Sequence, residues 1–341
     1  MSLVWTSTQL PKKRPEIWRR RKDEMHKAQV AFNEDRIIAE PPLFAVLDGH
    51  GGQLVGQEAE KLLRKKLGKK RWTKAGESEE NALVRIFGEI DRELYTKVHQ
   101  LYQDPEVPPR GMNALKPWRS GSTCTAVKIA RNGRELLCAS LGDSQLYGFE
   151  YDEASGGHIV SFAGPLHSAT DPAEIARVEQ AGGKVYAGRV GGVLAVARSF
   201  GDFDTEKMNS PFSKKPRTYP DKMIVSAVPD VARLPLQSYL GEEVWWVLAS
   251  DGLWDIVDTG YVAEILDEIR EDYGNIPWEE RIEILTAMLP HATRSREKWI
   301  RRKRNGKPAL PPVYDLEKPP KMTEYPHDDR SIIVFVTNLP E

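Results

Sequence analysis

Four aspartates stand at the edges of strongly apolar segments, and this pattern restricts the fold more than any other feature of the sequence. They are Asp48, Asp143, Asp251 and Asp328. A carboxylate beside a buried strand costs several kcal/mol unless it is paired or bound to a cation. One such aspartate is explained by a turn, but four together predict strand ends that converge on a single cation site.

Oxygen-only ligation favours Mg²⁺ or Mn²⁺ over Zn²⁺ at such a site. An earlier acidic pair, Glu34 and Asp35, lies on a segment expected to form a strand. Carboxylates of this kind commonly orient water bound to a cation. We therefore expect these two residues beside the cation site.

The charge balance excludes several classes of protein. Lys and Arg number 49 against 50 Asp and Glu, which argues against a dedicated nucleic-acid binder. No apolar run approaches the roughly 18 residues of a membrane span, and no secretory signal is apparent. Cys124 and Cys138 lie in apolar stretches, which predicts reduced, buried thiols and a cytoplasmic or nuclear location.

Hydrophobic periodicity predicts an α+β protein with many strands in meander order and no strict β-α-β alternation. A basic N-terminal arm over 1–27 is expected, followed by one domain over 28–341. Asn132-Gly133 predicts a hairpin turn between β-rich segments at 123–130 and 135–149. Further strands are expected at 43–47, 158–163, 193–197, 223–228, 244–249 and 332–336. Helices are expected at 53–69, 78–103, 171–181, 260–272 and 277–303.

Several motifs resemble, in order, those of the metal-dependent protein serine/threonine phosphatases of the protein phosphatase 2C (PPM) family. The resemblance covers about residues 28–337. The motifs are Asn33-Glu-Asp35, Asp48-Gly-His-Gly-Gly52, Gly121-Ser-Thr-Cys-Thr-Ala126, Leu141-Gly-Asp-Ser144, Asp171-Pro…Ala181-Gly-Gly183, Leu194-Ala-Val-Ala-Arg-Ser-Phe-Gly-Asp202, Leu248-Ala-Ser-Asp-Gly-Leu-Trp-Asp255 and His327-Asp-Asp-Arg-Ser-Ile332.

The resemblance implies a four-layer α-β-β-α sandwich of two antiparallel sheets flanked by helix pairs. It also implies two Mn²⁺ or Mg²⁺ ions and a weaker third. Asp48 would bridge the two ions, and the Gly49 carbonyl, Asp251 and Asp328 would complete the ligands. Asp143 would hold the third ion. Glu34 and Asp35 would hold water bound to the ions.

The resemblance further implies hydrolysis of phosphoserine and phosphothreonine in a phosphorylated protein substrate, with a water bridging the two ions as nucleophile. Two cations about 4 Å apart activate such a water and neutralise the phosphate. His50 would be the general acid, because a serine or threonine alkoxide is a poor leaving group. A monomer is expected.

The sequence departs from the family at its phosphate-binding arginine. Ala28 and Val30 stand where Gly-x-Arg is usual. Arg36, Arg198 or the N-terminal arm would have to supply the missing guanidinium. A flap-like loop at 203–221 and a Pro-rich insertion at 305–327 are expected to set specificity.

The main alternative is a weak or inactive pseudophosphatase that acts as a binding scaffold. The missing arginine favours it, and the complete set of carboxylates with His50 opposes it. A cysteine phosphatase is disfavoured, because six residues rather than five separate Cys124 from Arg131. An aspartyl-phosphate enzyme built on Asp202-Phe-Asp-Thr205 is disfavoured because no apolar strand leads directly into it.

Overall fold

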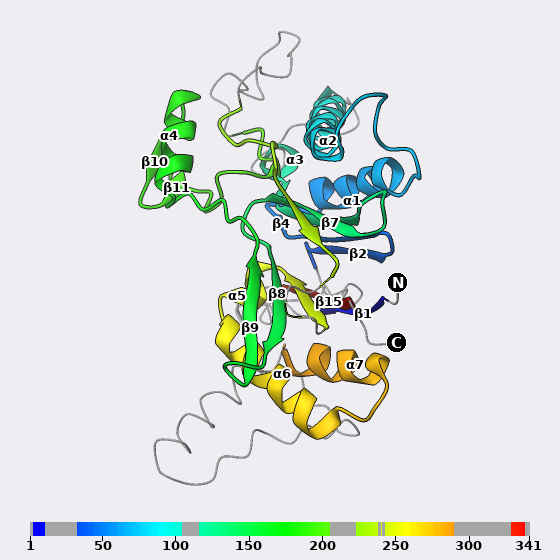
Figure 1. Cartoon of the computed structure of the whole chain (residues 1–341). Helices are drawn as coiled ribbons and strands as arrows, with labels where there is room; N and C mark the ends of the chain where they lie inside the picture. Colours follow the sequence, from blue (N-terminus) through cyan, green and yellow to red (C-terminus); the bar gives the residue numbers. More distant parts are fainter. Residues whose placement is uncertain are drawn as a thin grey trace, which may run out of the picture.

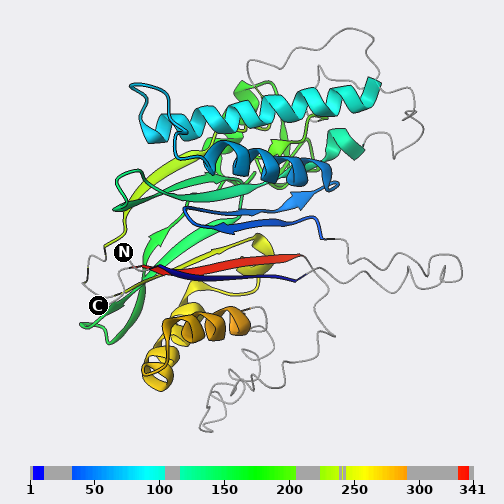
Figure 2. The same ribbon diagram turned by 90° about the vertical axis from the view of Figure 1, so that its right-hand side faces the viewer.

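A computed structural model describes residues 3–10, 33–103, 116–204, 223–237, 240, 243–289 and 329–337. Two five-stranded antiparallel sheets lie face to face, and helices cover the outer face of each (Figures 1 and 2). This arrangement confirms the predicted four-layer α+β sandwich.

The first sheet has the strand order β1-β15-β14-β8-β9. Its strands are β1 (Val4–Leu10), β15 (Arg330–Thr337), β14 (Val244–Ala249), β8 (Gln145–Asp152) and β9 (Gly157–Ala163). The second sheet has the order β13-β7-β6-β3-β2. Its strands are β13 (Asp230–Pro235), β7 (Glu135–Leu141), β6 (Cys124–Ile129), β3 (Leu43–Leu47) and β2 (Arg36–Glu40).

Alternating side chains of the central strands fill two different layers of core. In β3, Phe44 and Val46 point toward the first sheet, whereas Leu43, Ala45 and Leu47 pack under the helices. Successive residues of a strand face opposite sides of the sheet, so both faces of β3 are buried. The Phe44 ring stacks on Phe335 of the opposite sheet, with ring centroids 4.7 Å apart.

Amphipathic helix pairs complete the sandwich. Helices α1 (Leu54–Leu67) and α2 (Glu79–Gln103) cover the second sheet, and α6 (Thr259–Tyr273) and α7 (Trp278–Met288) cover the first (Figure 2). Their apolar residues recur at helical spacing, which is why the sequence predicts them well. The helix expected at 277–303 is described only as far as α7, and the 305–327 insertion lies outside the described residues.

Smaller elements lie at one end of the sandwich. Short strands β4 (Gly49–His50), β5 (Gly121–Ser122) and β12 (Phe200–Gly201) form a small sheet, and α3 (Lys116–Arg119) and α5 (Asp251–Trp254) are single turns. Helix α4 (Pro172–Gln180) and the hairpin of β10 (Val185–Tyr186) and β11 (Arg189–Val190) project to one side (Figure 1).

Three predictions about strands are wrong. The β-rich stretch 135–149 is two strands in different sheets, because Gly142, with φ of 104°, turns the chain between β7 and β8. Residues 193–197 and 223–228 form only isolated bridges, and the strand that follows is β13. Residues 4–10, which the predicted arm includes, form β1 within the first sheet, and residues 11–32 lie outside the described part.

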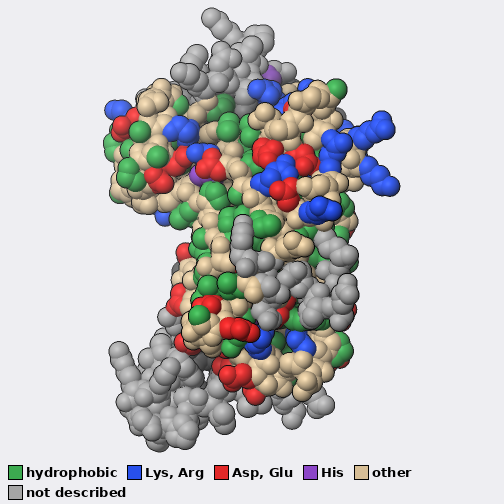
Figure 3. All heavy atoms as spheres, viewed as in Figure 1, with side chains coloured by type: hydrophobic (Ala, Val, Ile, Leu, Met, Phe, Trp, Pro, Cys, Tyr) green, Lys and Arg blue, Asp and Glu red, His purple; other side chains and the backbone are tan. Residues whose placement is uncertain are grey.

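Two further expectations concern the surface and the thiols. Cys124 and Cys138 are free and buried, as predicted. Acidic and basic side chains are interspersed over the face in Figure 3, in keeping with the net charge of −1. No helix in the described ranges has the length and apolar character of a membrane span. Residues 205–222, most of the flap-like loop, lie outside those ranges.

Candidate active site

Two of the predicted ligands come from different sheets and meet at one end of the sandwich. Asp48 follows β3, and Asp251 follows β14 and opens α5. The two carboxyl groups are within hydrogen-bonding reach of each other. Burial, and then the carboxylates of Asp35 and Asp251, raise the pKa of Asp48 well above its usual range. Such crowding of carboxylates is relieved when a cation binds between them.

Asp143 joins this group from the turn between β7 and β8. Burial, followed by the negative charge of Asp251, raises the pKa of Asp143 to about 7. A pocket of about 420 Å³ opens here, and Tyr147 and Trp254 line it together with both carboxylates. The pocket gives solvent and small ions a way to Asp143 and Asp251.

The residues present fit a hard divalent cation. Oδ1 of Asp251 is buried and has no hydrogen-bond partner within the described part of the chain. An orphaned carboxylate oxygen beside two further carboxylates is the donor chemistry that Mg²⁺ and Mn²⁺ prefer. Within the described ranges, no group of three or more His, Cys, Asp or Glu side chains is arranged so that it could hold a metal ion. Asp328, the remaining predicted ligand, lies outside those ranges.

The segment of Glu34 and Asp35 ties the two sheets together at the same place. The Glu34 amide donates to Oδ2 of Asp329, the neighbour of Asp328, at 2.8 Å. The hydroxyls of Ser331 and Ser250 donate to Oδ2 of Asp35, at 2.8 and 3.3 Å. Asp35 is therefore buried beside Asp48, where sequence analysis places it.

Thr123 fixes the Asp48 and Asp143 turns relative to each other. Its amide donates to the Asp48 carbonyl at 2.9 Å, and its hydroxyl accepts from the Asp48 amide at 3.2 Å. The same hydroxyl lies 2.8 Å from Oγ of Ser144. Both turns thus depend on one buried side chain at the start of β6.

His50 is paired with a carboxylate that sequence analysis did not single out for a role. Nε2 of His50 lies 2.8 and 2.9 Å from the two carboxylate oxygens of Asp202. Burial disfavours protonation of His50, but the charge and hydrogen bond of Asp202, together with the charges of Asp143 and Glu34, outweigh it and raise the pKa of His50 above its ordinary value. The pairing favours the protonated imidazolium, which is the form that can donate a proton.

The small sheet of β4, β5 and β12 brings this pair together. His50 pairs with Gly121, and Gly121 pairs with Gly201, next to Asp202. A Cβ on Gly121 would overlap both Nε2 of His50 and Oδ2 of Asp202. Only glycine at position 121 therefore leaves space for the contact.

Asp202 itself is held in an uncommon conformation. Its φ is 53°, which lies in the left-handed region that non-glycine residues seldom adopt. The hydroxyl of Ser199 donates to its carboxylate, and its amide donates to the Ser120 carbonyl. Such strain is typical of functional positions. The motif that ends in Gly201-Asp202 was the available signal, but its partner is 152 positions away in sequence.

The two arginines predicted as phosphate ligands already have partners. In Arg198, Nε and Nη2 bind Glu174 and Nη1 binds Asp230. In Arg36, Nη1 donates to the carbonyls of Asn33 and Asp35, and Nε lies 4.0 Å from Glu60. Phosphate binding by Arg198 would have to replace an existing ion pair.

Comparison with known proteins shows which proteins the chain is similar to. The family model of protein phosphatase 2C matches residues 14–290. Protein phosphatase 2C homolog 3 of Schizosaccharomyces pombe is 31% identical over 73% of this chain and 52% of its own length. The integrin-linked kinase-associated serine/threonine phosphatase 2C of Bos taurus is also 31% identical, over 74% of this chain and 62% of its own length. The chain thus spans about half to three fifths of these relatives.

Solved structures share the fold. A Caenorhabditis elegans sex determining protein superposes with a TM-score of 0.61 at 21% identity, covering all of this chain and 66% of that one. A phosphatase from a pathogenic strain of Toxoplasma gondii superposes with a TM-score of 0.59 at 19% identity, covering 98% of this chain and 92% of that one. At these identities the likeness supports the architecture alone.

Proposed function

Because the chain belongs to the protein phosphatase 2C family, we propose that it hydrolyses phosphoserine and phosphothreonine in proteins in a metal-dependent reaction. The observation that carries the proposal is the meeting of Asp48 and Asp251 from opposite sheets. His50, which pairs with Asp202, is two positions after Asp48 in the chain. A cation site and a proton donor are the two requirements for releasing a poor alkoxide leaving group from phosphate.

Asp48, the Gly49 carbonyl, Asp251 and Asp328 would hold two Mn²⁺ or Mg²⁺ ions, and Asp143 with Asp251 would hold a weaker third. When bound, these ions supply an activated water and neutralise the phosphate charge. Glu34 and Asp35 would orient the water around them. Asp35 can do so because Ser250 and Ser331 fix its carboxylate.

His50 would donate a proton to the serine or threonine oxygen as the ester bond breaks. Asp202 keeps the ring oriented through Nε2 and favours its protonated form. Among the two arginine candidates, Arg36 is better placed to bind phosphate. Its Nη2 makes no hydrogen bond to the described residues, whereas every guanidinium nitrogen of Arg198 is engaged.

The test is hydrolysis of a phosphothreonine peptide by the purified chain with Mn²⁺, with Mg²⁺ and with EDTA. We expect turnover that needs metal and that falls at least ~100-fold in Asp48→Asn. Asp267→Asn is the matched control, because Asp267 pairs with His158 between β9 and α6 and not at the candidate site. Metal binding without turnover in the wild-type chain would favour the scaffold alternative. If the wild-type chain shows no metal binding and no turnover, the proposed cation site is wrong.

A further inference from the structure

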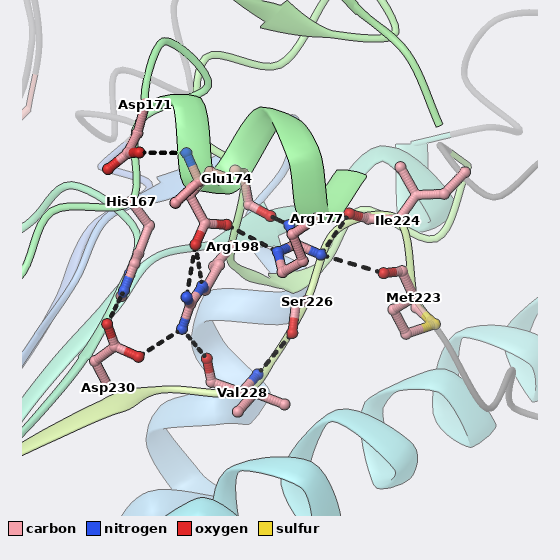
Figure 4. A network of polar contacts seen from close by, with 12 residues as sticks. His167, Asp171, Glu174, Arg177, Arg198, Met223, Ile224, Ser226, Val228 and Asp230 are labelled. Carbon is pink, nitrogen blue, oxygen red and sulfur yellow. Dashed lines mark hydrogen bonds and ion pairs between the residues drawn. The ribbon is translucent and has the colours of Figure 1, made fainter. Parts of the chain in front are cut away.

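A line of polar side chains runs from Glu174 of α4 to His167 (Figure 4). Oε1 of Glu174 accepts from Nε and Nη2 of Arg198, at 2.8 and 2.6 Å. Nη1 of Arg198 donates to Oδ1 of Asp230 at 2.8 Å. Oδ2 of Asp230 lies 3.1 Å from Nε2 of His167. We call these four residues the α4 relay.

The relay ends on the backbone next to Asp143. Nδ1 of His167 accepts from the Gly142 amide at 3.1 Å, and the His167 amide donates to the Gly142 carbonyl at 2.9 Å. Because Nδ1 is an acceptor, Nε2 carries the proton and donates to Asp230. His167 is only 3% exposed, so one neutral tautomer is held between a carboxylate and a backbone amide.

The Gly142 turn has little space to move away from this contact. A Cβ on Gly142 would overlap the side chain of Thr123 and would lie 3.1 Å from the Arg198 carbonyl oxygen. Thr123 also binds Asp48, as described above. The turn is therefore confined between the relay on one side and the Asp48 segment on the other.

The α4 end of the relay is equally well fixed. Arg177 donates from Nε to Oε2 of Glu174, and its Nη1 and Nη2 donate to the carbonyls of Ile224 and Ala197. Glu174 is only 4% exposed. Removing one partner from a buried, hydrogen-bonded charge pair costs far more than breaking a surface pair. Each member of the relay thus constrains the next.

We propose that His167 and Asp230 are positioning residues that set the orientation of Asp143. Through the α4 relay, cation affinity at Asp143 and Asp251 then depends on how α4 packs against the rest of the protein. The inference rests on the proposed function. A carboxylate ligand binds a cation tightly only when its support fixes its direction, and loss of such support typically lowers affinity or activity 10- to 100-fold. Because the relay acts through a backbone turn, we expect its loss to lower cation affinity by about 3- to 10-fold.

The experiment uses the full chain and titrates Mn²⁺ by electron paramagnetic resonance and by phosphothreonine peptide turnover. Asp230→Asn and His167→Phe each interrupt the relay without removing a predicted ligand. Both variants should raise the Mn²⁺ concentration for half-maximal activity about 3- to 10-fold. Both should also weaken binding of the most weakly held Mn²⁺ ion by about the same factor, ~3- to 10-fold. The KM for the peptide at saturating Mn²⁺ should be unchanged.

Asp267→Asn is again the matched control, since it removes the carboxylate partner of another buried histidine at 2.7 Å. We expect its Mn²⁺ dependence to equal that of the wild type. A double-mutant cycle then places the effect at Asp143. In an Asp143→Asn background, Asp230→Asn should produce no further change in Mn²⁺ dependence. If Asp230→Asn does not fold, Glu174→Gln interrupts the same relay at its α4 end.

Three results would overturn the inference. Relay variants with a lower melting temperature but wild-type Mn²⁺ dependence would show that the relay is only structural. If the effects of Asp230→Asn and Asp143→Asn on Mn²⁺ dependence are fully additive, the relay acts at a place other than Asp143. A wild-type chain without Mn²⁺ binding or turnover would remove the proposed function itself, and that failure is recognised before any variant is measured.

Discussion

At the scale of single residues, the contact between His50 and Asp202 has unusual structural requirements. It joins two segments far apart in the chain, needs a left-handed conformation at Asp202, and needs a glycine at position 121. Three independent constraints on one 2.8 Å contact suggest that its geometry matters for chemistry more than for stability.

The requirement for glycine gives a direct prediction. In Gly121→Ala, the added methyl group would occupy the space where His50 and Asp202 meet. We expect phosphopeptide turnover to fall at least ~10-fold while the chain still binds Mn²⁺, because the predicted ligands are untouched. Gly88→Ala, in α2 where a Cβ would make only an ordinary contact with Arg92 at 3.5 Å, is the control for an added methyl group. Wild-type turnover in Gly121→Ala would contradict the role of the pair.

Asp202→Asn tests whether the pair acts on the leaving group. The variant keeps the shape of the side chain but removes the charge that favours the His50 imidazolium. Turnover of a phosphothreonine peptide should fall ~10-fold or more, whereas p-nitrophenyl phosphate, whose leaving group needs no proton, should be much less affected. Asp204→Asn is the neighbouring control, since Asp204 pairs with Arg119 instead. Equal losses on both substrates would point to a structural role for Asp202.

The sequence indicates which strand ends carry Asp48 and Asp251, but it does not indicate the partners of the candidate-site residues. Asp48 and Asp251 could be found because each sits beside an unbroken apolar strand, which is a local pattern. The roles of Asp202 and of the His167–Asp230 contact could not be predicted from the sequence, because they depend on which loops the fold brings together. Arg198 illustrates the limit: its type suggests phosphate binding, yet the fold surrounds it with Glu174 and Asp230.

At the scale of elements, helices follow from the sequence more faithfully than strands do. The ends of α1, α2, α4 and α6 differ from the expected ones by two residues or fewer, because each helix buries one periodic apolar face. Short β-rich stretches carry no information about their partner, so the sequence predicts a strand at 193–197, where the structure has only isolated bridges, and does not predict β13. Pairing to β7 makes β13 a strand, and that contact is not local.

Helix α6 carries a measurable electrostatic cost. Partial burial of Glu268, and then the charges of Asp272 and Glu264, raise its pKa to about 7. Because the folded state holds this proton more tightly than the unfolded state, the contribution of Glu268 to stability is present below about pH 4.5 and is lost as pH rises through 7.

We therefore expect Glu268→Gln to be more stable than wild type at pH 8 by about 1 kcal/mol, after allowing for its partial exposure, and nearly equal to it below pH 4.5. Urea denaturation at several pH values measures the difference. Glu279→Gln, which removes a carboxylate from an exposed position of α7, is the matched control. A constant difference at all pH values would contradict the assignment.

At the scale of the whole molecule, the candidate cation site lies across the interface between the two sheets. Asp48 belongs to the β3 side and Asp251 to the β14 side. A ligand that binds only the folded state stabilises it by RT ln(1 + [L]/Kd), which is ~2.7 kcal/mol at a hundredfold excess over Kd.

Metal addition should therefore raise the melting temperature of the wild-type chain, and EDTA should reverse the rise. In Asp48→Asn we expect little response, because the shared ligand between the sheets is lost. Differential scanning calorimetry with Mn²⁺ and with EDTA measures both. An equal rise in the variant would show that Mn²⁺ stabilises the protein somewhere else.

The order of strands in the first sheet has a consequence for how the protein is made. β15 lies between β1 and β14, so the last described strand of the chain is an inner strand of its sheet. β1 pairs with β15 along its whole length, from Val4 with Val336 to Leu10 with Arg330. A ribosome adds roughly 5–20 residues per second, so β1 waits on the order of tens of seconds before its partner is synthesised. Once β14 has been synthesised, the nascent chain has the edges of β1 and β14 without the strand that joins them until β15 follows, and we expect chaperones to bind it in that period.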